Sequence, residues 1–106
     1  TSTAVKLDTD LHISRLSNFL DTFLAKHGAD LYRTKGIVSF AGSEHKWILQ
    51  GVHEDLRLFE SQEVWKPGEQ RVSTVVFIGR KLDATTCRSS LEACCMRPGE
   101  EMMESL

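Results

Sequence analysis

The sequence predicts an α+β domain in which helices pack on one face of a mainly antiparallel sheet of four to five strands, with ferredoxin-like character. Apolar residues recur at helical spacing near the N-terminus, alternate at strand spacing through the middle of the chain, and return to helical spacing after a last hydrophobic strand. The predicted order is strand, helix, two to three antiparallel strands, a long strand and a second helix. At 106 residues, the chain is long enough for one domain with its own core.

The N-terminal part of the chain predicts one strand and one helix. Residues 1–8 alternate loosely, and Thr9 or Asp10 is a suitable N-cap for the helix that follows. Gly28 is suited to the left-handed turn that ends many helices, so we expect this helix to end near His27. The apolar stripe of the helix comprises Ile13, Leu16, Leu20, Phe23 and Leu24.

The middle of the chain predicts strands. The apolar period becomes two from Leu31, and residues 37–40 and 47–53 form the expected hairpin around a turn at 41–44. Residues 56–59 predict a short further strand, and Pro67-Gly68 marks the next turn. Residues 72–78 are the most hydrophobic segment, so we expect a central strand that is buried on both faces.

The C-terminal part predicts a second helix and a tail. Asp83 is a good N-cap. Pro98-Gly99 should end any helix, so we divide the chain into a domain over residues 1–95 and a flexible acidic tail over 96–106. The apolar face of the second helix comprises Ala84, Cys87, Leu91 and Cys94.

Composition argues against several classes of partner. The net charge of −2 provides no long-range attraction for nucleic acid or an anionic membrane, and the longest apolar run is too short to cross a bilayer. The segment from Lys35 to Phe40 is similar to an RNA-binding strand motif, but Ile37 and Ser39 occupy its aromatic positions. The three cysteines are an odd number and lie close together, which predicts reduced thiols and a cytoplasmic protein.

No catalytic motif is present in the sequence. It contains no Gly-Lys pair for a phosphate-binding loop, no His-Glu-x-x-His and no Gly-x-Ser-x-Gly. Cys87 and Cys94 would lie about 10 Å apart along one helix, too far to share a zinc ion, so we expect both in the core. Cys95 is expected to be more exposed. We therefore expect no enzyme activity and no cofactor in this chain.

Some polar and aromatic residues are candidates for a partner surface. Arg33 and Lys35 share one strand face, and Arg80 with Lys81 ends another strand, so the four would form a basic patch if those strands are neighbours. The patch either docks an acidic segment or a phosphate-bearing partner domain, or consists of solvated strand edges. His53 is a weak candidate for a metal or partner contact, and a structural or surface role is the favoured interpretation. Trp65 is a large apolar surface that either covers the sheet or meets a partner.

Blocks of residues across the chain resemble the C-terminal domain of the CobW family, GTP-dependent metallochaperones related to the GTPases that insert nickel into hydrogenase and urease. The similarity extends from Leu11 to Cys95, and its Gln-Gly-Val-His form is closer to the zinc-linked branch. The blocks are Leu31-x-Arg33-x-Lys35-Gly36, Leu49-Gln50-Gly51-Val52-His53, Trp65, Arg71 and Val76-Phe77-Ile78-Gly79-Arg80-x-Leu82-Asp83.

The resemblance implies an accessory domain of a larger GTPase. In that family an N-terminal domain with a phosphate-binding loop and a Cys-x-Cys-Cys motif handles GTP and a divalent metal, here zinc or cobalt. Glu92 precedes Ala93-Cys94-Cys95, so this chain lacks the metal motif. The implied partners are the N-terminal GTPase domain of the same protein and a client metalloprotein. The family positions carried over are Arg33, Lys35, Gly36, Gln50, Gly51, His53, Trp65, Gly79 and Arg80.

A second hypothesis remains from another functional class. The chain could be a stand-alone ferredoxin-like sensor of a metal or small ligand, in which His53 binds the metal together with a neighbouring His or Cys. The first hypothesis instead assigns the partner surface to Arg33, Lys35, Gln50, His53, Trp65 and Arg80.

Overall fold

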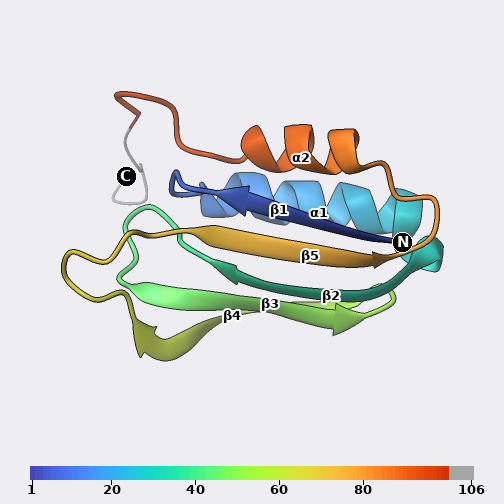
Figure 1. Cartoon of the computed structure of the whole chain (residues 1–106), viewed down its shortest axis with the longest axis horizontal. Coiled ribbons are helices and arrows are strands. Elements are labelled where there is room, and N and C mark those ends of the chain that lie inside the picture. Colours follow the sequence, from blue (N-terminus) through green and yellow to red (C-terminus); the bar gives the residue numbers. More distant parts are fainter. Residues whose placement is uncertain (101–106) are drawn as a thin grey trace.

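Two α-helices lie against one sheet of five strands in the computed structural model, which describes residues 1–100 (Figure 1). A single 3-10 turn, Gly28–Asp30, follows the first helix. The strands are β1 (Ser2–Leu7), β2 (Leu31–Val38), β3 (His45–Val52), β4 (Asp55–Val64) and β5 (Ser73–Gly79), and the helices are α1 (Ile13–His27) and α2 (Ala84–Glu92).

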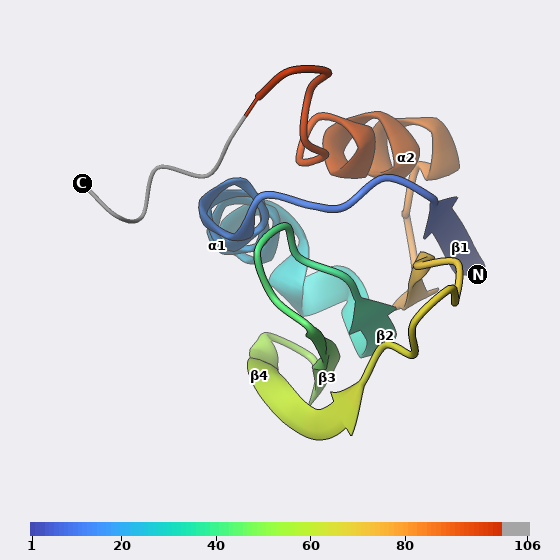
Figure 2. The same ribbon diagram turned by 90° about the vertical axis from the view of Figure 1, so that its left-hand side faces the viewer.

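The strand order is β1-β5-β2-β3-β4, and every neighbouring pair is antiparallel. Strands β1 and β2 are therefore parallel to each other, with β5 between them and α1 connecting them. This split β-α-β arrangement is the ferredoxin-like element that the sequence predicts. Figure 2 shows both helices on the same side of the curved sheet, so the α+β prediction is confirmed.

The core lies between the helices and the side of the sheet that faces them. From α1, Leu16, Leu20 and Phe23 are buried, as the apolar stripe predicts. The ring centroid of Phe23 lies 4.8 Å from that of Phe77 on β5. Cys87, Cys94 and Cys95 are all reduced, so no disulfide contributes to stability. The burial of apolar side chains on this side stabilises the fold instead.

Both ends of α1 differ from the prediction. The N-cap is His12 rather than Thr9 or Asp10, because Leu11 is drawn into the core between Phe40 and Cys95. Asp10 instead accepts a hydrogen bond from the Ser39 hydroxyl at 2.7 Å.

Gly28 does not take the predicted left-handed conformation. It has φ −54° and ψ −38°, so the chain continues into the 3-10 turn. A Cβ at this position would lie 3.1 Å from Cβ of Glu54, which indicates that glycine serves here for close approach to the β3–β4 hairpin.

Two strands differ in extent from the prediction. Strand β2 covers Leu31–Val38, so it begins where the apolar period becomes two but ends before residue 40, and β4 has ten residues, where the sequence predicted only residues 56–59. The second half of β4 was not predicted, because the residues of this edge strand after Phe59 are mostly polar and show little apolar alternation. The two predicted turns are present, with left-handed Gly42 and Gly68 at φ 85° and 79°.

Strand β5 is not buried on both faces, which corrects the prediction for residues 72–78. Val75 and Phe77 face the helices and are fully buried, whereas Ile78 is exposed on the opposite side. Helices cover only one side of the sheet (Figure 2), so the other side of every strand lacks a second layer within the described residues. The middle strand in the order is β2, not β5.

The second helix begins where Asp83 predicts. Its carboxylate accepts hydrogen bonds from the Thr85 backbone N–H at 3.1 Å and the Thr86 hydroxyl at 2.7 Å. Cys87 and Leu91 are buried as expected, but Ala84 is exposed.

The segment after α2 returns to the start of α1. The Met96 N–H donates to the Asp10 carbonyl at 2.8 Å, and Arg15 bonds both the Cys95 carbonyl and the Glu100 carboxylate. Of the predicted tail, residues 96–100 form this connection, and 101–106 lie outside the described residues.

Candidate functional site on the open face of the sheet

The side of the sheet opposite the helices is the candidate functional site. We call it the open face and define it by three cross-strand rows on β5, β2, β3 and β4. The pairing register places neighbouring members of a row directly opposite one another. The rows are Ile78–Arg33–Val52–Asp55, Val76–Lys35–Gln50–Arg57 and Thr74–Ile37–Ile48–Phe59.

Three of the six predicted partner-surface residues lie together on the open face. Arg33 and Lys35 alternate with buried Thr34 on β2, and Gln50 is directly opposite Lys35 on β3. A shallow depression between β2 and β3 is lined by all three and by Val52. Parity along each strand brings these side chains to the same side.

Arg57 belongs to the same group, although it was not among the residues predicted from the sequence. It is directly opposite Gln50, so the middle row reads cation, amide, cation across three strands. Its signal was the alternation of β4, in which Leu56 and Leu58 pack on the core and Arg57 points to the other side. Within residues 1–100, neither Arg57 nor Arg33 nor Lys35 takes part in an ion pair.

Arg80 lies beside this group but is neutralised within the domain. Its Nε donates to the Asp30 carboxylate at 2.7 Å, and this hydrogen bond raises the pKa of the guanidinium. Strands β2 and β5 are neighbours, as the predicted basic patch requires. Lys81, however, lines a hollow near the helices together with Phe23 and His27, so it does not join the cations of the open face. Among the described residues, the unpaired cations of the three rows are therefore Arg33, Lys35 and Arg57 rather than the four that parity suggested.

His53 occupies the tight β3–β4 turn in a left-handed conformation, with φ 53°. Its Nδ1 donates to the Leu31 carbonyl at 3.1 Å, and its backbone N–H donates to the Tyr32 carbonyl at 3.2 Å. These bonds fasten the turn to the start of β2. Only Nε2 of the ring is left for a ligand.

Trp65 is buried within the domain and is not exposed to a partner. It is 9% exposed at the end of β4, and the Lys46 ammonium lies 4.9 Å from its ring centroid. The Lys46 ammonium is in turn 2.7 Å from Glu63 and 3.6 Å from Glu69, and the hydrogen bond to Glu63 raises the pKa of the lysine.

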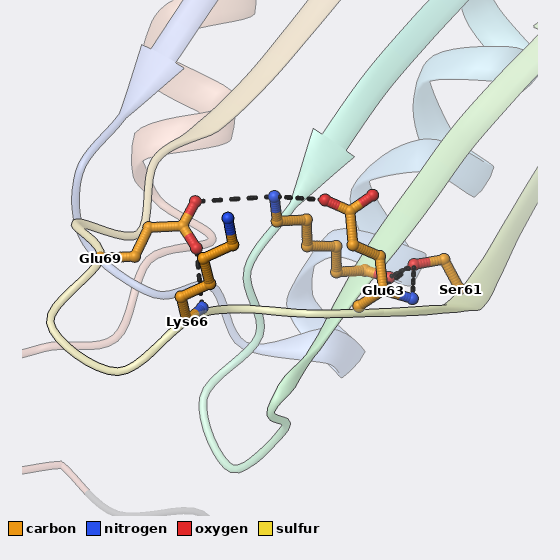
Figure 3. A network of polar contacts seen from close by, with 5 residues as sticks. Ser61, Glu63, Lys66 and Glu69 are labelled. Atoms are coloured by element: carbon orange, nitrogen blue, oxygen red, sulfur yellow. Dashed lines mark hydrogen bonds and ion pairs between the residues drawn. The ribbon is translucent and has the colours of Figure 1, made fainter.

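Figure 3 shows this network where β4 passes into the loop. The carboxylates of Glu63 and Glu69 lie on the two sides of the Lys46 ammonium. Glu69 also accepts a hydrogen bond from the Lys66 backbone N–H at 2.7 Å. That backbone bond is the main reason why the pKa of Glu69 is lowered. The network holds the loop in place and neutralises Lys46, so this lysine does not extend the group of unpaired cations on the open face.

The donor groups of the described part of the chain do not fit a metal site. Residues 1–100 contain no cluster of three or more His, Cys, Asp or Glu side chains that could hold an ion. Metals bind the thiolate, yet burial raises the pKa of Cys87, of Cys95 and, to about 11, of Cys94. None of the helices formed by these residues has the length and apolar character required to cross a bilayer.

Comparison with known proteins gives the family. Residues 1–95 match the model described as "Cobalamin synthesis protein cobW C-terminal domain". The chain belongs to this family. The predicted resemblance is thereby confirmed over the whole sheet and both helices of this CobW C-terminal domain.

A solved structure shares the fold. The Zn(II)-bound YjiA GTPase from E. coli matches this CobW C-terminal domain with a TM-score of 0.84 and 27% sequence identity, over 91% of this chain and 30% of that one. A Zn(II)-bound triple mutant of YjiA matches with the same values. The chain thus corresponds to less than one third of YjiA.

Proposed function

We propose that this chain is the accessory C-terminal domain of a CobW-like GTPase that acts as a metal chaperone. In this proposal the chain recognises either the N-terminal GTPase domain of the same protein or a client metalloprotein, and catalyses no reaction itself. GTP and the divalent metal, zinc or cobalt, are handled by the GTPase domain. Family membership over residues 1–95 supports the proposal, as does the likeness to YjiA, a GTPase whose solved structure is Zn(II)-bound.

The observation that carries an interaction role is the composition of the open face. A solvated sheet face is normally polar, because polar residues alternate with the apolar residues of the core. Here that face carries exposed Ile37, Val52, Phe59 and Ile78. Exposed apolar groups that are gathered on one surface are typical of a surface that binds another protein.

The alternative, a stand-alone metal sensor, has less support. It requires His53 and further ligands close by, but residues 1–100 contain no cluster of three or more His, Cys, Asp or Glu side chains that could hold an ion. The three free cysteines instead agree with a protein of the reducing cytoplasm, which we include in the proposal.

The purified chain and the parent protein test this function together. We expect no GTP hydrolysis by the chain alone and hydrolysis by the parent, because no phosphate-binding loop is present in this sequence. Zinc titration of the chain, followed by calorimetry, should give no site in the micromolar range. Hydrolysis by the chain itself would refute the accessory role. Zinc binding at micromolar or lower concentration with proton release would favour the sensor.

A further inference from the structure

We propose that the open face docks against the upstream GTPase domain of the same polypeptide, through a patch of that domain that combines carboxylates with aliphatic side chains. The inference rests on the proposed function and names its partner and contact surface. Four observations on this side of the sheet carry it: the exposed apolar side chains, the unpaired cations, their mutual arrangement and the position of Thr1.

The apolar part of the open face is large for a surface in water. Four of its side chains retain considerable exposure: Ile37 44%, Val52 58%, Phe59 41% and Ile78 39%. They lie in the two outer rows and come from four neighbouring strands, so they form parts of one surface rather than scattered exceptions. Covering them with a second protein layer would remove this apolar area from water.

The cations of the open face lack counter-ions within the described residues. Lys46 and Arg80, which flank this face, each have a carboxylate partner within 2.7 Å. Arg33, Lys35 and Arg57 have none, and the three rows contain a single acid, Asp55, at the edge of the sheet. Because the whole chain has a net charge of −2, its acids are concentrated elsewhere. A partner that supplies carboxylates would complete these pairs.

The arrangement of charge disfavours other occupants. In a symmetric dimer each open face would meet its own copy, so the cations would oppose one another. A membrane could take up the apolar side chains of the two outer rows only by burying Arg33, Lys35 and Arg57 together with them. Nucleic acid binds sheet faces through aromatic stacking, and Phe59 is the one aromatic residue in the three rows.

The position of Thr1 selects the upstream domain. The Thr1 carbonyl accepts the Gly79 N–H at 2.9 Å, and Ser2 is directly opposite Ile78. The chain that joins an upstream domain to Thr1 therefore reaches this domain close to the row that contains Ile78, Arg33 and Val52. Figure 1 shows the N-terminus at this end of the sheet, next to the tip of β5.

Separation of the two halves of the parent protein tests the contact. A protease site is placed in the linker before Thr1, the protein is cleaved, and the affinity between the halves is measured by calorimetry and size exclusion. The double variant Arg33→Glu/Lys35→Glu should weaken association about tenfold or more, because it turns two attractive contacts into repulsive ones. High salt should weaken the wild-type association in the same direction.

Matched variants separate docking from folding. Lys26→Glu/Arg88→Glu makes the same charge change on the exposed side of the helices and should alter affinity less than about twofold. Val52→Ser/Ile78→Ser removes apolar area without changing charge and should weaken association as well. All variants are compared by circular dichroism and thermal unfolding, where we expect curves close to the wild type.

Two failures are distinguishable. If the wild-type halves associate and the open-face variants bind as tightly as the wild type, or if the wild-type halves do not associate, the docking face is wrong while the accessory role stands. If the chain hydrolyses GTP alone, the proposed function is wrong. Binding of the wild-type chain to RNA or to anionic vesicles through Arg33 and Lys35 would assign the face to another class of partner and overturn the inference.

Discussion

The three cysteine thiols show how individual residues are controlled by their surroundings. Cys87 and Cys94 are buried, and Cys95 is half-buried behind the end of α2. Burial is the main cause that raises the pKa of each thiol, to about 11 for Cys94. The Cys94 thiol also donates to the Ser90 carbonyl at 3.3 Å. All three therefore behave as small packing residues rather than as nucleophiles or metal ligands.

This protection predicts slow alkylation of the folded protein. At pH 8 the thiolate fraction of Cys94 should be roughly a hundredth of that of an unperturbed thiol, because its pKa is raised from 9.0 to about 11. Iodoacetamide labelling followed by peptide mass spectrometry should modify Cys95 first, because it is the least buried of the three, and all three once the protein is unfolded. Rapid labelling of Cys94 in the folded state would contradict the assignment.

At the scale of elements, glycines allow strands to approach more closely than side chains would permit. Gly36 lies within β2, and a Cβ there would lie 2.8 Å from the Thr74 carbonyl oxygen and 3.3 Å from Cα of Val75. The obstructing atoms belong to the backbone of β5, in the interior of the sheet, so they cannot move aside without breaking pairing. In the sequence this glycine is only a position of a family motif, and packing against β5 explains why it is there.

Gly36→Ala should therefore lower the free energy of unfolding by about 1–3 kcal/mol, as overpacking of an interior site usually does. Gly28→Ala is the matched control. The added methyl at Gly28 would lie 3.1 Å from Cβ of Glu54, a tighter approach than most but to an exposed turn rather than within the sheet, and the backbone is already helical. Its effect should stay below about 1 kcal/mol, the size of the helical preference for alanine over glycine. Urea unfolding curves measure both, and equal losses would argue against a specific role for Gly36.

At the scale of the whole molecule, the C-terminal segment is fastened to the beginning of the first helix. Glu100 and Arg15 are 85 residues apart and form an ion pair, with one hydrogen bond at 2.9 Å. The hydrogen bond from Arg15 is the main cause that lowers the pKa of Glu100 to about 2, and the backbone N–H of Arg97 contributes. This end of the described chain is thus connected to the domain by charge as well as by backbone bonds.

This ion pair predicts a pH-dependent contribution to stability. A carboxyl group whose pKa is lowered by folding stabilises the native state above its ordinary pKa, near 4.5, and loses that contribution as the pH falls towards about 2. Glu100→Gln should therefore lower the melting temperature at pH 7, and the difference from the wild type should shrink below pH 4.5 and disappear near pH 2. Thermal scans across this range measure it. A difference that is independent of pH would show that charge is not the cause.

Local patterns in the sequence determined most of the elements. The apolar stripe of α1, the turn at Gly42 and the Asp83 cap each depend on residues within one or two turns of one another, so periodicity and capping chemistry were sufficient. Residue blocks spread over the chain likewise indicated the CobW C-terminal domain, although they identified no site chemistry.

The tertiary structure alone decided which surface is available to a partner. Whether Ile78 is buried depends on how many helices cover the sheet, and no pattern within β5 contains that information. Arg57 joins Lys35 only through the register of three strands, while Arg80 is neutralised by Asp30, 50 residues away. Cross-strand pairing and ion pairing join residues that are distant in the chain. The composition of the open face was therefore settled by the assembled sheet, whereas the helices, strands and turns that build it were already indicated by local sequence.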